Sequence, residues 1–341
     1  MKNYLPFLFF LVLTACNNDN KQTKIAAAAT KDSTAPSQQP VAVEQKLDTA
    51  KYNQLMKYLS NNDSTGRWPV KSAPYPNAGA VLPFHRIVAY YGNLYSKKMG
   101  VLGEYPKDEM IKRLMAEVKK WSAADSLMPA IPALHYIAVT AQGSPGKDGK
   151  YRYRMPLSQI DTVLNWAKPI NALVFIDVQL GMSSLQSEIP LLEKYLALPN
   201  VHLGIDPEFA MAKKGKKPGT VVGTLDAEDI NYVGNYLVSL VKKYHLPPKI
   251  FIVHRFTQGM VTNAKKIQTH PEIQVVMDMD GWGTQERKRS TYYDWINPEP
   301  VQFTGFKLFY KNDTQKVGAK QEMQPPDVIR LRPRPVYVQY Q

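Results

Sequence analysis

Cysteine is almost absent from this chain, which has one residue of this type, Cys16, in 341 positions. A lone cysteine excludes an intramolecular disulfide, so the folded chain has to be held together by its hydrophobic core. Beyond its first residues, the chain also lacks any apolar run of the roughly 20 residues that would span a bilayer.

Two short motifs are missing as well. The sequence contains no HExxH zinc motif and no GxSxG nucleophile elbow, both of which place reactive groups at fixed local spacings. We therefore expect no metal, no other cofactor and no serine nucleophile. A metal held by Asp, Glu and His from different strands stays open as an alternative, because such ligands need no local spacing.

The start of the chain is typical of an exported lipoprotein. Lys2 supplies a short positive start, and Tyr4–Ala15 is an apolar run of signal-peptide length. Leu13–Cys16 then resembles a lipobox, in which small residues admit a peptidase and the cysteine takes a diacylglycerol. We expect lipidation of Cys16 and attachment to the bacterial cell envelope. Because Asn17 replaces the common Asp retention signal, transport to the outer membrane is consistent with the sequence.

Negative charge is also scarce relative to positive charge. The chain has 43 basic and 29 acidic residues, a formal net charge of +14. A basic exported protein favours anionic glycans, lipid headgroups or nucleic acid as partners. Aromatic and basic residues interleave only locally, so we expect no nucleic acid and favour a carbohydrate substrate or ligand.

Composition divides the chain into four parts. They are a signal peptide (1–15), a flexible tether poor in large apolar residues (16–48), a lead-in with a short helix over Thr49–Leu59 (49–82), and a folded domain (83–341). The folded part is long enough for one large core, and we expect it to be a monomer.

Within the folded part, β-branched and aromatic runs alternate with helical patterns. The strands we expect are Arg86–Tyr91, Ala133–Thr140, Ala172–Gln179, Val201–Asp206, Lys249–His254, Ile273–Asp280, Phe303–Phe309 and Pro335–Tyr340. The helices we expect are Lys107–Asp125, Leu157–Lys168, Leu185–Leu198 and Ala227–Tyr244, the last with Asp226 as its N-cap. Eight such units favour a (β/α)8 TIM barrel. An open doubly wound sheet is the alternative, but Gly92–Tyr95 is not its Gly-rich phosphate turn.

Ionisable residues gather where the predicted strands end. In a barrel these ends share one rim, and the chemistry of such enzymes is found there. The residues concerned are Asp177, Asp206, Glu208, His254, Asp280 and Lys307. A single carboxylate beside apolar residues is usually a structural hydrogen-bonding group, whereas several on one rim favour a functional cluster.

Paired carboxylates on facing strands are what glycoside hydrolysis requires. One carboxyl donates a proton to the leaving oxygen, while the other attacks or activates water. We expect Glu208 to be the acid and Asp280 its partner, with Asp206 beside them. His254 and Lys307 would tune these acids or bind a substrate carboxylate, and Asp177 would be a further contact. Tyr91 and Trp282 are expected to stack on sugar rings.

Two basic loops are predicted to border the same rim. The first contains Lys147, Lys150, Arg152 and Arg154, and the second contains Lys213, Lys214, Lys216 and Lys217. They indicate a mouth that attracts substrates carrying carboxylates, phosphates or sulfates, although charged loops are commonly just solvated. The other histidines, His85, His135, His202, His245 and His270, show no partner in the sequence and are expected to be structural.

Several segments resemble a family of secreted bacterial proteins with a glycosidase-like TIM barrel. The similar stretches are Tyr90–Glu104, Gly204–Phe209, Val253–Val261, Met279–Gly283 and Gly305–Tyr310. The resemblance implies a barrel from about residue 83 to the C-terminus, with Asp206, Glu208, His254, Asp280 and Lys307 at polar positions characteristic of the family. The chain departs from the family at Arg255, where the family has Gln, and at Trp282, where it has a smaller polar residue. The resemblance implies architecture and export, but no particular reaction.

Together these observations favour an exported lipoprotein that hydrolyses glycan, acidic polysaccharide or cell-envelope glycan in particular. Two alternatives stay open. One is a barrel that binds glycan or the cell envelope without catalysis, and the other is a metal-dependent hydrolase of phosphate or acyl esters.

Overall fold

A computed structural model of the chain describes residues 46–318 and 320–341. The predicted signal peptide, the lipidation site Cys16 and most of the predicted tether therefore lie outside the described residues. Within the described part, no helix combines the length and the apolar composition that crossing a membrane requires.

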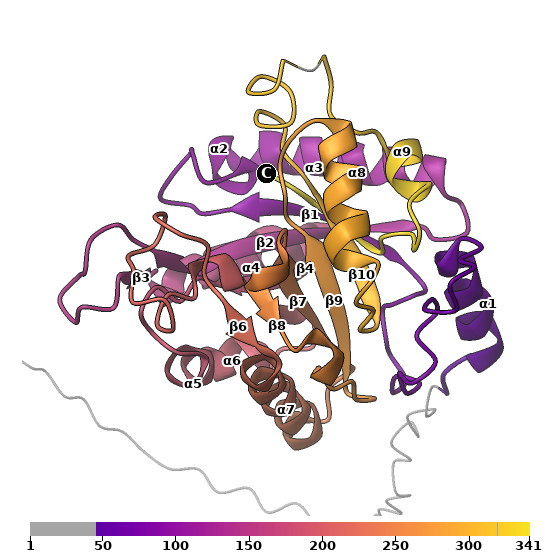
Figure 1. Ribbon diagram of the computed structural model, residues 1–341, viewed down its shortest axis with the longest axis horizontal. Helices are drawn as coiled ribbons and strands as arrows, with labels where there is room; N and C mark the ends of the chain where they lie inside the picture. The colour runs from indigo at the N-terminus through magenta and orange to yellow at the C-terminus, as the bar shows by residue number, and fades with distance from the viewer. Residues whose placement is uncertain (1–45, 319) are drawn as a thin grey trace, which may run out of the picture. The chain divides into compact units, whose positions relative to one another are not determined.

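Eight parallel strands form one closed sheet (Figure 1). They are β1 (Arg86–Gly92), β2 (Ala130–Ala141), β4 (Leu173–Val178), β5 (Val201–Ile205), β7 (Lys249–Arg255), β9 (Ile273–Met279), β10 (Phe303–Leu308) and β11 (Tyr337–Tyr340). Strand β1 pairs with β2 on one side and with β11 on the other, which closes the ring. The predicted TIM barrel is thus confirmed, and each of the eight predicted strands corresponds to a barrel strand.

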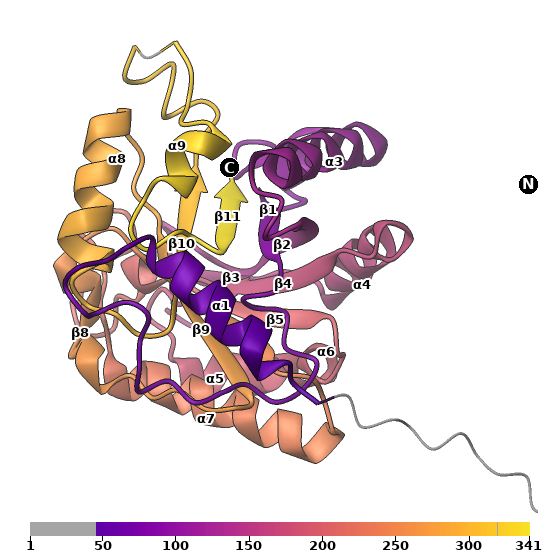
Figure 2. The same cartoon turned by 90° about the vertical axis from the view of Figure 1, so that its right-hand side faces the viewer.

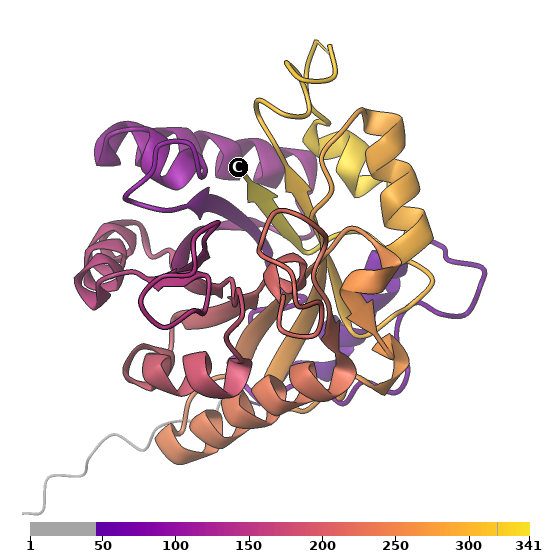
Figure 3. The same cartoon turned by 60° about the vertical axis from the view of Figure 1, so that its left-hand side comes forward.

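Helices surround this ring on its outer side (Figure 3). They are α2 (Val101–Glu104), α3 (Lys107–Ala124), α4 (Leu157–Ala167), α5 (Leu185–Glu188), α6 (Glu193–Leu196), α7 (Ala227–Tyr244), α8 (Gln285–Thr291) and α9 (Pro325–Ile329). The single helix predicted over Leu185–Leu198 is wrong. Pro190 has no amide to donate and crowds the preceding turn, so the segment divides into α5, a 3-10 turn at Ile189–Leu192, and α6.

Helix α7 has the predicted bounds, and its N-terminus is fixed by side-chain capping. Asp226 accepts a hydrogen bond from the Glu228 amide, while the Asp229 side chain accepts one from the Asp226 amide, which forms a capping box. Its apolar stripe, including Ile230, Val233 and Leu237, is buried against the outer face of the barrel. The local sequence and the tertiary environment favour the same helix here.

The smaller elements lie in the connections. Strand β3 (Arg152–Arg154) pairs antiparallel with β2, and β6 (Leu225–Asp226) pairs with β8 (Val261–Thr262). Short 3-10 turns occur at Lys168–Ile170, Pro207–Phe209, Gln258–Met260 and Ala264–Lys266, and a π-turn at Tyr292–Ile296 extends α8. The connections at 257–272 and 284–300 consist of these short elements and α8.

The barrel interior changes character along the strands. Side chains alternate between the interior and the helix layer, and those near the strand starts, such as Ile87, Phe175 and Ile252, form an apolar cluster. Helix α1 (Thr49–Ser60) lies across this end and buries Leu55 and other apolar residues against that cluster (Figure 2). The apolar layer and α1 therefore close one end, and the carboxylates inside the barrel, among them Asp177 and Asp278, lie towards the other end of the strands.

One buried ion pair joins the start of β1 to the end of α3. The guanidinium Nη1 of Arg86 lies 2.8 Å from Oδ2 of Asp125, and the two side chains are 0% and 2% exposed. Arg86 Nε also donates to the Pro335 carbonyl oxygen at 3.0 Å, and its guanidinium lies over the Trp121 ring. Such a pair compensates the burial of each charge only while both partners are present.

Candidate active site

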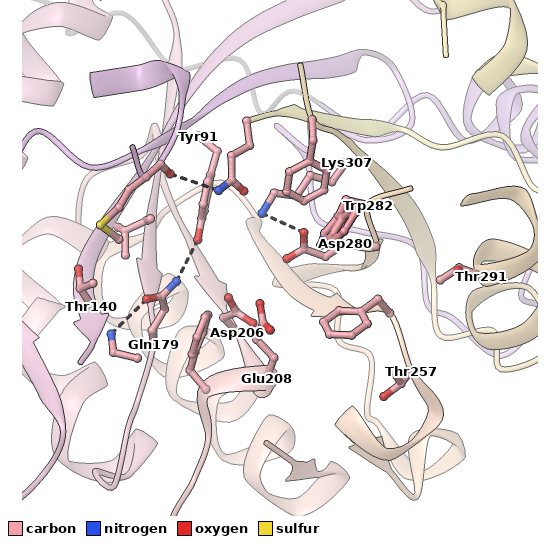
Figure 4. A pocket seen from close by; sticks show the side chains of 18 of the residues that line it. Tyr91, Thr140, Gln179, Asp206, Glu208, Thr257, Asp280, Trp282, Thr291 and Lys307 are labelled. Atoms are coloured by element: carbon pink, nitrogen blue, oxygen red, sulfur yellow. Dashed lines mark hydrogen bonds and ion pairs between the residues drawn. The ribbon is translucent and has the colours of Figure 1, made fainter. Parts of the chain in front are cut away.

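A cavity of about 780 Å³ opens at the end of the barrel where the strands finish. Its floor carries Tyr91, Asp206, Glu208, Asp280 and Lys307 from the ends of strands β1, β5, β9 and β10 (Figure 4). Phe209, Phe256, Trp282 and Phe309 supply apolar and aromatic wall. A concave, partly aromatic site with a few converging charged groups is the usual form of a small-molecule or glycan pocket.

Three carboxylates converge on this floor. One oxygen each of Asp206, Glu208 and Asp280 lies within 4.8 Å of the other two. Asp206 and Glu208 come together because β5 ends at Ile205 and Pro207 then starts a 3-10 turn, which directs both side chains towards the cavity. Asp280 follows the last residue of β9. The strand-end pattern therefore located side chains that meet in space.

Glu208 and Asp206 keep their protons to a higher pH than free carboxyl groups do. Burial, together with the neighbouring charge of Asp280, raises the pKa of Glu208 to about 7. Burial and the charge of Glu208 raise the pKa of Asp206 well above its usual value. A carboxyl group that holds its proton near neutral pH is suited to act as a general acid.

Asp280 has a different environment, since cations face it. Lys307 Nζ lies 2.9 Å from Asp280 Oδ1, and His254 Nδ1 lies 3.4 Å from Asp280 Oδ2. Burial opposes the charge of Lys307, but the carboxylates of Asp280 and Asp206 outweigh it and raise the pKa of Lys307. The Lys307 ammonium also lies 3.9 Å from the centre of the Tyr91 ring. Lys307 is therefore a fixed positive charge beside Asp280.

Below the floor lies a second polar group inside the barrel. His254 Nδ1 is 3.1 Å from Asp278 Oδ2, and Asp177 Oδ2 accepts a hydrogen bond of 2.9 Å from the Tyr91 hydroxyl. Burial lowers the pKa of His254, but its contacts with Asp177 and Asp278 reverse the effect and raise that pKa well above its usual value. Burial raises the pKa of Asp177, but the two neighbouring histidines, His135 and His254, lower it further than burial raises it.

The residues predicted for the site thus fall into two groups, one that lines the cavity and one that is buried below its floor. Asp206, Glu208, Asp280, Lys307, Tyr91 and Trp282 line the cavity. Trp282 is 43% exposed and presents a ring at the mouth, whereas Tyr91 is buried and holds its hydroxyl on Asp177. Asp177 and His254 are fully buried and do not line the cavity, so they contact its floor only through Tyr91 and Asp280.

Sequence reasoning missed several residues of the site. His135, expected to be structural and without a partner, faces Asp177 inside the barrel. Its position two residues after Ala133 on the same strand is the period-2 signal that could have placed it inside. Lys98 and Arg287 also line the cavity, from the connections after β1 and β9. They do not lie directly at a strand end, so the pattern of ionisable residues at strand ends could not identify them.

The two basic loops contribute less than predicted. Arg152 and Arg154 both pair with Glu188, and Lys213 pairs with Asp229. The other five lysines of these loops are exposed, and none of the eight basic residues lines the cavity. The basic residues that line the cavity are instead Lys98, Arg287 and Lys307.

The fold and the site together define a (β/α)8 barrel with an acidic, lysine-flanked pocket at the carboxyl ends of its strands. No protein-family model matches this chain, and no curated protein matches it. The likeness to secreted glycosidase-like barrels is therefore supported at the level of the fold alone.

Proposed function

We propose that this protein is a glycoside hydrolase that retains anomeric configuration, with Glu208 as general acid/base and Asp280 as nucleophile. The observation that carries the proposal is that one carboxylate oxygen each of Asp206, Glu208 and Asp280 lies within 4.8 Å of the other two in one cavity, so the nearest oxygens leave little room for a water between the groups. Retaining enzymes place their two carboxyl groups about 5–5.5 Å apart, whereas inverting enzymes need about 6.5–9.5 Å to admit a water.

The different environments of the two carboxyl groups support these roles. In the first step the Asp280 carboxylate attacks the anomeric carbon, the glycosidic bond breaks, and the Glu208 proton passes to the leaving oxygen. In the second step the Glu208 carboxylate takes a proton from water, whose oxygen displaces Asp280 from the anomeric carbon. Lys307 holds Asp280 in place, and the charge of Asp280 helps Glu208 to keep its proton.

Charges at the cavity mouth favour an acidic glycan as substrate. Lys98 and Arg287 line the cavity, are exposed, and have no carboxylate partner within the described ranges 46–318 and 320–341. A uronic acid or other anionic sugar would supply that partner, and Trp282 would stack on a ring. Together with the lipobox at Cys16, this favours action at the cell envelope from a lipid-anchored position.

The direct test is hydrolysis by the purified full-length protein. A panel of neutral and uronate-containing polysaccharides is incubated with it, and release of reducing ends is measured. For any substrate found, proton NMR gives the configuration of the first product. Release with retained configuration is expected. Binding without release across the panel would indicate the non-catalytic barrel and overturn the proposal, and inverted product would overturn the roles given to Asp280 and Glu208.

The pH dependence of kcat/KM reports on the proton of Glu208. Because its pKa is raised to about 7, the acid is protonated below that pH and loses its proton above it. We expect kcat/KM to fall about tenfold per pH unit on the alkaline side of pH 7. The fall is measured by initial rates in overlapping buffers. A profile that stays flat well above neutral pH would contradict the role of Glu208.

Arg287→Gln tests the preference for acidic glycans. We expect KM for a uronate-containing substrate to rise about 10–150-fold, equivalent to the roughly 1.5–3 kcal/mol of a hydrogen bond to a charged group, while hydrolysis of a neutral glycan is unchanged. Arg289→Gln is the matched control, since Arg289 lies on the same helix but is directed towards Asp327 and Gln285. Two outcomes would show that Arg287 does not recognise an acidic substrate. One is an equal change in KM for Arg287→Gln and Arg289→Gln, and the other is an equal change for Arg287→Gln on the uronate-containing and the neutral glycan.

A further inference from the structure

Three buried polar atoms face one another below the cavity floor. They are His135 Nε2 on β2, Asp177 Oδ1 on β4 and His254 Nε2 on β7, and all three side chains are 0% exposed. His135 Nε2 is 3.5 Å and His254 Nε2 is 3.7 Å from Asp177 Oδ1. None of the three atoms has a hydrogen-bond partner among the described residues. Such an arrangement is costly unless something satisfies the three atoms together.

The other polar atom of each of these three side chains already has a hydrogen-bonding partner. His254 Nδ1 contacts Asp278 Oδ2 at 3.1 Å, and Asp177 Oδ2 accepts from Tyr91. His135 Nδ1 contacts the Tyr337 hydroxyl at 2.6 Å and the Gln339 side-chain amide at 3.1 Å. A histidine that donates its Nδ1 proton to a carboxylate directs an Nε2 lone pair away from it. Partners of this kind orient the ligands of protein-bound metals and fix the histidine tautomer.

The backbone also leaves space for this arrangement. Gly204 on β5 is adjacent to two of the three atoms, and a Cβ at this position would lie 2.6 Å from Asp177 Oδ1 and 2.7 Å from His135 Nε2. Any larger residue would therefore displace the aspartate or the histidine. Glycine at position 204 therefore allows Asp177 Oδ1 and His135 Nε2 to face each other.

The charge of this part of the barrel is unbalanced. Its carboxyl groups are Asp177, Asp206, Glu208, Asp278 and Asp280, four of them buried and Glu208 partly buried. Within the described structure, the cationic groups in contact with them are the Lys307 ammonium and the His254 imidazole in its protonated form. The remaining charge has to be met by protons or by a bound cation, because buried carboxylates are strongly destabilised without compensation.

We propose that His135, Asp177 and His254 bind a divalent transition metal, with Zn²⁺ the best fit. Zinc takes nitrogen and carboxylate ligands at about 2.0–2.2 Å in tetrahedral geometry, which places neighbouring ligand atoms about 3.4 Å apart. The two measured separations, 3.5 and 3.7 Å, are close to that value. Two imidazoles disfavour Mg²⁺ and Ca²⁺, which prefer oxygen ligands.

This inference is independent of the proposed hydrolysis. The three ligands do not line the cavity, so the metal would join β2, β4 and β7 from inside the barrel rather than contact a substrate. No local motif predicts it, because its ligands come from three separate strands. His254 would link the site to the floor above through its 3.4 Å contact with Asp280.

The test measures metal directly on the full-length protein. Protein freed of metal by chelator and dialysis is titrated with Zn²⁺, and bound metal is counted by mass spectrometry. We expect one equivalent per chain and a raised thermal midpoint. With Co²⁺ in place of Zn²⁺, we expect the visible absorption of a four-coordinate site made by the three side chains and one water. No stoichiometric binding of either ion would overturn the proposal and leave protons or water to satisfy the three atoms.

Variants then locate the metal. His135→Gln and Asp177→Asn should abolish stoichiometric binding, whereas His202→Gln should retain it. His202 is also buried inside the barrel, but its Nδ1 accepts from the Ile250 amide at 3.1 Å, away from Asp177. If a variant fails to fold, the Co²⁺ spectrum of the unaltered protein still reports whether nitrogen ligands are present. Binding that survives both substitutions, or a spectrum of oxygen ligands alone, would overturn this site.

Discussion

Glu208→Gln is expected to lower kcat on a polysaccharide by about 10²–10⁴-fold, the usual contribution of a general acid. Glutamine preserves the size of the side chain but has no proton to transfer, so the leaving oxygen departs as a poorly stabilised alkoxide. Since the residue lines the cavity and is only partly buried, we expect the variant to fold. The measurement is kcat from reducing-end release, with folding checked by circular dichroism.

A comparison of substrates with different leaving groups distinguishes whether Glu208 is a general acid or only a structural carboxyl. An aryl glycoside with an acidic phenol departs without protonation, so Glu208→Gln should slow its first step far less than that of a polysaccharide. Glu228→Gln is the matched control, since Glu228 is an exposed carboxylate at the start of α7 and remote from the cavity lining. An equal loss on both substrates would show that Glu208 acts by positioning or stability and not by proton donation.

Asp125→Ala is expected to lower the free energy of unfolding by about 3–5 kcal/mol, because it leaves the Arg86 charge buried without its partner. The two side chains are 0% and 2% exposed, so water cannot replace the lost carboxylate without opening the base of the barrel. A loss of this size is a large share of the roughly 5–15 kcal/mol that stabilises a typical domain. Urea unfolding followed by tryptophan fluorescence gives the value.

A second ion pair connected to the same helix provides the comparison. Glu109 and Arg113 on α3 are 2.7 Å apart, but their side chains are 42% and 48% exposed. Glu109→Ala should therefore cost no more than about 0.5 kcal/mol. If Asp125→Ala costs as little as Glu109→Ala, the pair at the start of β1 is not what compensates the burial of Arg86.

The fold could be predicted because strand and helix periods alternate clearly along the chain. Helix α7 shows this best, since its cap and its apolar stripe are both visible in the sequence. The floor of the cavity could be predicted too, because Asp206, Glu208 and Asp280 follow strands whose ends share one rim. The single helix predicted across Pro190 is an avoidable error, because a proline inside an otherwise helical pattern is itself a signal that the helix is interrupted.

Other parts of the site depend on information that the sequence does not carry locally. Strand alternation could have placed His135 inside the barrel, but its meeting with Asp177 depends on the register of β2 against β4. Lys98 and Arg287 reach the cavity from connections whose path is set by tertiary packing. The basic loops looked like the charged mouth, but Glu188, a residue remote in the sequence, pairs with two of their arginines.

The closure of the sheet also affects how these molecules behave when crowded. Each barrel strand in the described structure has a hydrogen-bonded neighbour on both sides, because β1 pairs with β2 and with β11. Amides and carbonyls along an open sheet margin would provide a template on which a strand from another molecule could add. A closed ring has no such margin, so fibrous self-association would first require a barrel to come apart. Proteins held at high density on a two-dimensional surface would benefit from that protection.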